Sequence, residues 1–181
     1  MLAPVEATAR PGYELWRPNR AKSENKITRV LVAIVFLISA ALILIIAIGG
    51  WDKLQSGTVA AIAVGWALMY ILFAFLVLRW NRGVLPVGSA FAIILAIFAV
   101  VAAPAWFARD KEGLTSPALP DELLGLLTFL LVPVQLVLIA IAMVGFNQNW
   151  HVEEERRTDG REEHDDSPPD ADDRRPAAAP A

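Results

Sequence analysis

The sequence predicts an all-α, polytopic membrane protein: an antiparallel bundle of four transmembrane helices followed by a disordered C-terminal tail. Hydrophobic residues make up 56% of the 181 residues and charged residues 19%. An ordinary globular domain has about 45–50% apolar and about 25% charged residues. The apolar residues are gathered into four long runs, and the connections between them are short. Short connections make consecutive helices antiparallel neighbours.

Each apolar run is long enough to cross the hydrocarbon core of a bilayer, which takes about 20 helical residues. None of the runs contains Asp, Glu, Lys, Arg or His. One such run would fit a buried helix of a soluble protein, but four of them leave almost nothing to form a soluble exterior. The predicted spans are residues 30–48, 58–78, 84–107 and 123–146, within a transmembrane domain of residues 30–150.

The first span is expected to be retained rather than cleaved as a signal peptide. It follows 29 mostly polar residues, and its apolar stretch exceeds the usual signal core of about 7–15 residues. It ends in Gly49 and Gly50, where we expect a helix terminus that uses the left-handed conformation open to glycine.

The loop charges predict the orientation, because cytoplasmic loops carry an excess of Lys and Arg. Residues 1–29, the second loop and the tail together hold 13 of these cations, whereas the first and third loops hold three. Both termini are therefore expected in the cytoplasm. Trp51, Trp80, Trp106 and Trp150 fall near span ends, where an indole suits the headgroup level.

Small residues predict where the helices approach closely, as they do in membrane bundles. Gly57, Ala61 and Gly65 share one face of the second span, and Gly88, Ala92 and Ala96 share one face of the third. We expect these two faces to contact each other or a neighbouring span. Chance is the alternative, because alanine is frequent throughout the chain.

Pro133 and Gln135 mark the middle of the fourth span. A proline there removes one backbone hydrogen bond and favours a kink. Gln135 is the most polar side chain deep in any span. Either the two residues form a functional polar site, or Gln135 is bonded to a neighbouring helix as a structural contact; the second interpretation is favoured.

The N-terminal segment, residues 1–29, is expected to be partly disordered and basic near the membrane. Its cations beside the first span are Arg17, Arg20, Lys22, Lys26 and Arg29. Such clusters bind anionic lipid headgroups. Topogenesis alone accounts for the same pattern without any ligand, and of the two interpretations it is the favoured one.

The tail, residues 151–181, is predicted to be acidic, cytoplasmic and disordered, with 11 acidic residues against five arginines and few apolar side chains. Its first residues, Glu153 to Arg157, are a candidate extension of the fourth helix. We expect the tail either to attract the basic N-terminal segment weakly and in a salt-sensitive way, or to solvate the protein, or to bind a basic partner.

The sequence predicts no catalytic, cofactor-binding or metal-binding residues, and no nucleic-acid partner. There is no cysteine, and the two histidines, His151 and His164, lie outside the spans. The spans therefore lack histidine ligands for a haem, and they lack the acids on which proton-coupled transport usually depends. An isolated His164 beside Asp165 and Asp166 is a weak metal motif.

Two functions remain open. The first is a non-catalytic accessory or interaction component of a membrane complex. The second is a small transporter or channel protomer, with a path formed in an oligomer near Pro133, Gln135 and residues 147–149. Arginine-rich, alanine-rich composition favours a bacterial source, and hence a multi-pass protein of the plasma (inner) membrane.

Overall fold

The computed structural model describes residues 13–51, 57–107, 119–150 and 152–157. It divides into two compact units, residues 18–152 and residues 1–17 with 153–181, and each is described by itself.

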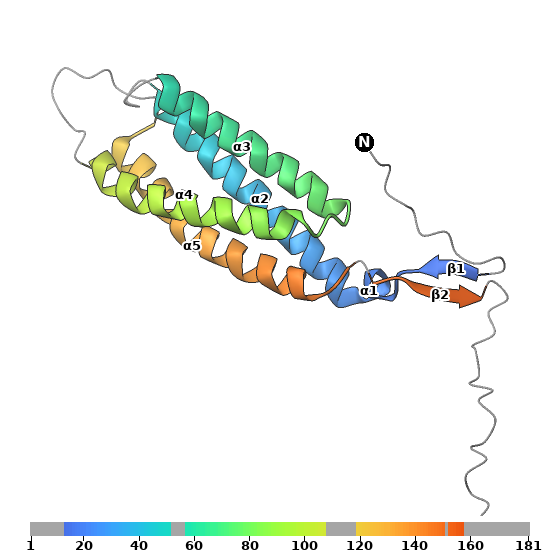
Figure 1. Ribbon diagram of the computed structural model, residues 1–181. Helices are drawn as coiled ribbons and strands as arrows, with labels where there is room; N and C mark the ends of the chain where they lie inside the picture. The colour runs from blue at the N-terminus through green and yellow to red at the C-terminus, as the bar shows by residue number, and fades with distance from the viewer. Residues whose placement is uncertain (1–12, 52–56, 108–118, 151, 158–181) are drawn as a thin grey trace, which may run out of the picture. The chain divides into compact units, whose positions relative to one another are not determined.

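The larger unit is a bundle of antiparallel helices (Figure 1). The short helix α1, Pro18–Ala21, precedes four long ones: α2, Ser23–Gly49; α3, Gly57–Leu78; α4, Val84–Phe107; and α5, Asp121–Asn147. All four long helices are apolar and long enough to cross a membrane. The predicted fold class is confirmed, and the chain is a membrane protein. The one sizeable difference in span limits is that α2 begins at Ser23 rather than at Val30.

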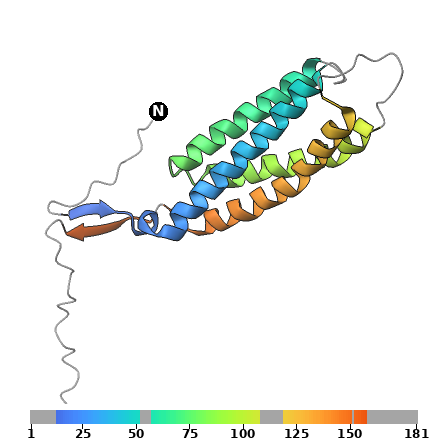
Figure 2. The same cartoon turned by 180° about the vertical axis from the view of Figure 1, so that it is seen from behind.

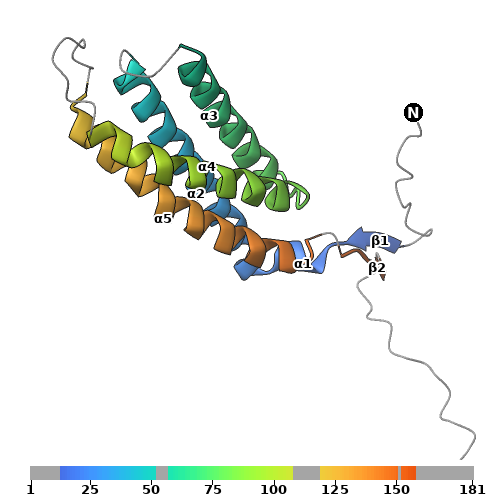
Figure 3. The ribbon, with the colours of Figure 1, turned by 60° about the vertical axis from the view of Figure 1, so that its left-hand side comes forward.

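Helix α2 lies between α3 and α5, and α4 packs along α5 (Figure 2). The backbones of α3 and α4 approach each other much less, although a short turn joins them. The two helices diverge from that turn (Figure 3). The backbone order around the bundle is therefore α3, α2, α5, α4.

The predicted contact between small-residue faces is half right. On α4, Gly88 and Ala92 are buried, and a Cβ on Gly88 would lie 2.4 Å from Cζ of Phe36 in α2. On α3, Ala61 and Gly65 are exposed, and a Cβ on Gly65 would meet nothing within 4 Å. The α4 face contacts a neighbouring span, whereas the α3 face points away from the bundle.

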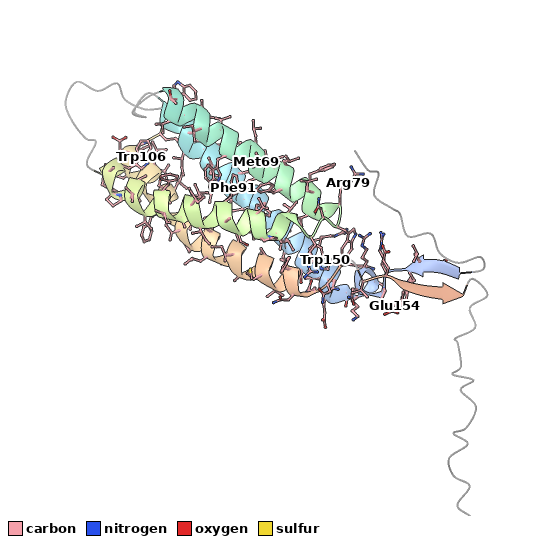
Figure 4. All side chains as sticks on the ribbon, in the orientation of Figure 1. Met69, Arg79, Phe91, Trp106, Trp150 and Glu154 are labelled. Atoms are coloured by element: carbon pink, nitrogen blue, oxygen red, sulfur yellow. The ribbon has the colours of Figure 1, made fainter. Side chains whose placement is uncertain are left out.

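Aromatic rings explain why α3 and α4 stand apart. Trp66 of α3 lies 5.0 Å from Phe91 of α4, and Phe73 of α3 lies 5.4 Å from the same ring, measured between centroids. Phe91 lies on the side of α4 toward α3 (Figure 4). Edge-on ring pairs need centroid separations of about 4.5–7 Å, which exclude the close backbone approach that small residues permit.

Gly49 and Gly50 end α2, as predicted, but not for the predicted reason. Gly50 has φ −106°, so it does not use the left-handed conformation. A Cβ on Gly49 would lie 2.5 Å from Leu119, and one on Gly50 would lie 2.5 Å from Trp106. Glycine suits both positions because other side chains pack directly on the backbone, and a Cβ would have to displace them.

The smaller unit is an antiparallel two-stranded ribbon. Strand β1, Tyr13–Trp16, pairs with β2, Glu154–Arg157, so that Tyr13 lies opposite Arg157 and Trp16 opposite Glu154. The guanidinium of Arg17 donates hydrogen bonds to the Glu153 carboxylate, one of them 2.8 Å long from Nε. Helical extension from Glu153 to Arg157 is therefore wrong, and residues 154–157, expected in the disordered tail, form a strand instead. Residues 158–181 lie outside the described residues.

Candidate functional site

Polar side chains from three helices meet inside the bundle. Tyr70 of α3 donates through its hydroxyl to Oε1 of Gln135 in α5, at 2.9 Å. Nε2 of Gln135 donates to Oγ of Ser39 in α2, at 3.0 Å, and Ser39 donates in turn to the carbonyl of Val35, at 2.8 Å. All three side chains have 0% exposure. We name this set the buried polar triad.

The triad agrees with the structural interpretation of Gln135. An unpaired amide in an apolar interior is costly, whereas a bonded one links the helices that carry its partners. Both polar ends of the Gln135 amide bond side chains on other helices, as the favoured structural interpretation requires. Helix α5 continues through Pro133, which is exposed, to Asn147.

A second cluster lies where α2 begins, α3 ends, α4 begins and α5 ends; we call this the arginine-rich end. The turn after α3 places Trp80 at φ 64°. The amides of Trp80 and Asn81 bond the carbonyls of Val77 and Leu76, at 2.9 and 3.1 Å. This is a Schellman motif, in which the left-handed position usually belongs to glycine.

Stacking contacts hold the Trp80 ring. The guanidinium carbon of Arg29 lies 4.2 Å from a ring centroid of Trp80, and that of Arg20 lies 5.6 Å away. The indole of Trp150 meets Trp80 edge-on, with 5.5 Å between centroids. Arg29 also donates to the carbonyl of Leu78, at 3.1 Å. Together these contacts offset the unfavourable backbone conformation of Trp80.

Polar contacts fix Trp150 on its other side. Its Nε1 donates to Gln148, at 3.1 Å, and Gln148 donates to Thr28 of α2, at 2.9 Å. The carbonyl of Asn149, a residue with φ 48°, accepts from Asn19 of α1, at 3.0 Å. Two of the three residues at 147–149 are therefore used to attach the end of α5 to α1 and α2.

The four tryptophans at span ends do not share one role. Trp150 is fully buried and Trp106 is 2% exposed, so both pack inside the protein. Trp51 is 50% exposed, as a headgroup-level indole requires. The predicted position near a span end gives the depth of an indole but not the face on which it lies, so Trp106 and Trp150 stand near span ends and are nevertheless buried in the protein.

The five basic residues suggested as lipid ligands fall into different settings. Arg17 is paired with Glu153 in the smaller unit, Lys22 and Lys26 are exposed, and Arg20 and Arg29 lie against Trp80. Sequence reasoning missed Arg82, whose guanidinium carbon lies 4.2 Å from the ring centroid of Phe146 in α5. The signal available for it was its position in the short turn before α4. His151 and His164 lie outside the described residues.

Comparison of the chain with protein-family models, with curated proteins and with solved structures finds no match. The fold and the triad together define a class: a four-span helical membrane protein in which the buried polar groups of three spans bond one another.

Proposed function

We propose that the chain is a non-catalytic accessory component of a membrane complex, inserted in the plasma membrane of a bacterium with both termini in the cytoplasm. The observation that carries the proposal is the buried polar triad. Transport through a span needs polar groups that exchange partners with a substrate or with water. In the triad Tyr70, Gln135 and Ser39 are fully buried and bonded to one another, which favours a role in holding the bundle together.

The outward face of α3 supports an interaction role. Ala61 and Gly65 are exposed four residues apart, and a Cβ on Gly65 would have no neighbour within 4 Å. Small residues on a lipid-facing surface let another helix approach closely. Helix α3 packs mainly against α2, so this face is open to a transmembrane helix of a partner protein.

The orientation rests on the same charge bias that the sequence displays. Arg20, Arg29, Arg79 and Arg82 gather at one end of the bundle, the end expected in the cytoplasm.

The test is extraction of the tagged full-length chain from its native membrane in a mild detergent, followed by quantitative mass spectrometry of the recovered particle. We expect a second membrane protein at a fixed ratio. Gly65→Leu should lower its recovery at least several-fold, because leucine blocks close helix approach. Ala140→Leu, a similar change on an exposed face of α5, is the matched control and should leave recovery unchanged.

The competing function, a transporter or channel protomer, predicts a different result. The chain would then be recovered alone or as a self-oligomer. Proteoliposomes containing it would pass ions or solutes, and Gln135→Leu would abolish the flux. That combination would overturn the accessory proposal.

A further inference from the structure

The arginine-rich end carries a strong local excess of positive charge. Among the described residues of the larger unit, six cations gather there against one acid, Glu24. The cations are Arg20, Lys22, Lys26, Arg29, Arg79 and Arg82. At the opposite end, α5 opens with Asp121 and Glu122. A bilayer surface rich in anionic lipid attracts such an end, because its potential acts on every cation near the headgroups.

Arg29 and Arg82 differ from the exposed cations in how they are held. The guanidinium carbon of each lies 4.2 Å from the centroid of an aromatic ring, that of Trp80 for Arg29 and that of Phe146 for Arg82. The Nε of each is buried and has no hydrogen-bond partner in the described part of the chain. Aromatic contact fixes the group, and a guanidinium so held presents its terminal N–H groups as a planar fork suited to phosphate.

Neither arginine has a carboxylate counter-ion among the described residues. The acid nearest in sequence to Arg29, Glu24, is exposed. Arg29 uses Nη1 to bond the Leu78 carbonyl, and the side chain of Arg82 has no hydrogen bond to a described residue. A partly buried cation without a counter-ion is unfavourable, so an anion at this position stabilises it.

The position of the two arginines identifies the anion. Arg29 directly precedes the apolar run that begins at Val30, and Arg82 stands two residues before Val84, the first residue of α4. Both therefore lie at the boundary between hydrocarbon and water, where lipid phosphates are concentrated.

We propose that the arginine-rich end is a binding site for anionic phospholipids of the adjacent leaflet, with Arg29 and Arg82 donating hydrogen bonds to headgroup phosphates. Lys22 and Lys26 are exposed, and they add only a non-specific electrostatic attraction to the anionic surface. The inference depends on membrane insertion and on these side chains, and it is independent of any partner protein.

The test is native mass spectrometry of the purified full-length chain with dioleoyl phosphatidylglycerol, with dioleoyl phosphatidylcholine, or with phosphatidylglycerol plus millimolar inorganic phosphate. We expect selective retention of phosphatidylglycerol that inorganic phosphate does not displace. Arg29→Gln with Arg82→Gln should reduce retention by more than about fivefold, because even one of the two lost cation–headgroup contacts accounts for about that factor. Lys22→Gln with Lys26→Gln removes the same charge and should stay near wild type.

Circular dichroism and gel filtration establish that each variant is folded. Should the double arginine variant fail to fold, Arg82→Gln alone serves, with Arg79→Gln from the same turn as its control. Equal losses of lipid retention in the arginine and control variants would mean that general surface charge, and not a specific site, binds the lipid. That result would overturn the proposal. Equal retention of both lipids, or displacement by inorganic phosphate, would also overturn it.

Discussion

The hydroxyl of Tyr70 donates a 2.9 Å hydrogen bond to the amide oxygen of Gln135, 65 positions further along the chain. The bond joins α3 to α5, whereas the backbone of α3 packs mainly on α2. Gln135 also bonds Ser39 of α2. One amide therefore connects three of the four spans, and its loss leaves two buried groups without their partner.

Gln135→Leu is expected to lower the free energy of unfolding by about 1–3 kcal/mol, from two lost interhelical bonds and the desolvated hydroxyl of Tyr70 left behind. Unfolding by titration with sodium dodecyl sulfate measures the change. Leu136→Ala, at the neighbouring exposed position, should stay within about 0.5 kcal/mol of wild type. Similar stability of Gln135→Leu and wild type would contradict a structural role for the triad.

Leucine substitutions distinguish the two small-residue faces. Gly88→Leu must displace Phe36, which is fully buried, and should cost about 1–3 kcal/mol or prevent folding. Ala92→Leu, also at a buried position, should behave similarly, whereas Gly65→Leu should be tolerated by the isolated chain. Thermal unfolding in detergent compares the three variants. The reverse order of stability would mean that the α3 face, not the α4 face, is packed.

The backbone at Trp80 predicts an order between two substitutions. Both Trp80→Ala and Trp80→Gly lose the contacts with Arg29 and Trp150, so both should be less stable than wild type. At φ 64° a Cβ is unfavourable by about 1–2 kcal/mol, so the glycine variant should be the more stable of the two by about that amount. Thermal denaturation tests the order, and equal stability of the two variants would contradict the left-handed turn.

Cysteine crosslinking can test the register of the ribbon, because the chain contains no cysteine that would compete. Trp16 and Glu154 lie directly opposite, where Cβ atoms are about 4.5–5.5 Å apart. Trp16→Cys with Glu154→Cys should form a disulfide under mild oxidation. Trp16→Cys with Glu155→Cys places the two thiols on opposite faces of the ribbon and should not. Mass spectrometry of the peptides identifies the crosslinked pair. Preferential crosslinking to residue 155 would mean that the register differs by one residue from the one described.

Single cysteines test the orientation. Asn81→Cys lies in the turn at the arginine-rich end, and Pro120→Cys lies at the other end of the bundle; both positions are exposed. A maleimide that cannot cross membranes should label Pro120→Cys in intact cells and Asn81→Cys only after permeabilisation. The opposite labelling pattern would invert the proposed topology.

The spans were predictable from sequence because length and the absence of charge depend on composition alone. Pairing between helices was not, as Gly65 shows: its spacing resembles that of Gly88, yet only Gly88 faces a partner, the ring of Phe36. Apolar residues lie on every face of each span. A membrane helix therefore lacks the contrast between polar and apolar faces that reveals the buried side of a soluble helix.

The ribbon and the triad could not be predicted from local sequence patterns, for a different reason. Strand β1 pairs with residues from the other end of the chain, and β2 reads as a charged segment rather than an alternating strand. Gln135 was identifiable as polar and central. Its partners Tyr70 and Ser39 were not, because each belongs to a different span and only the packed bundle brings them together.

The mass of the particle that contains the chain shows whether the protein is a component of a larger membrane assembly, as we propose. Extraction with a membrane-solubilising polymer, followed by mass photometry, avoids detergent dissociation. We expect one particle whose mass exceeds that of the copies of this chain in it, reduced in mass by Gly65→Leu and unchanged by Ala140→Leu. A particle containing only copies of this chain, unaffected by Gly65→Leu, would contradict it.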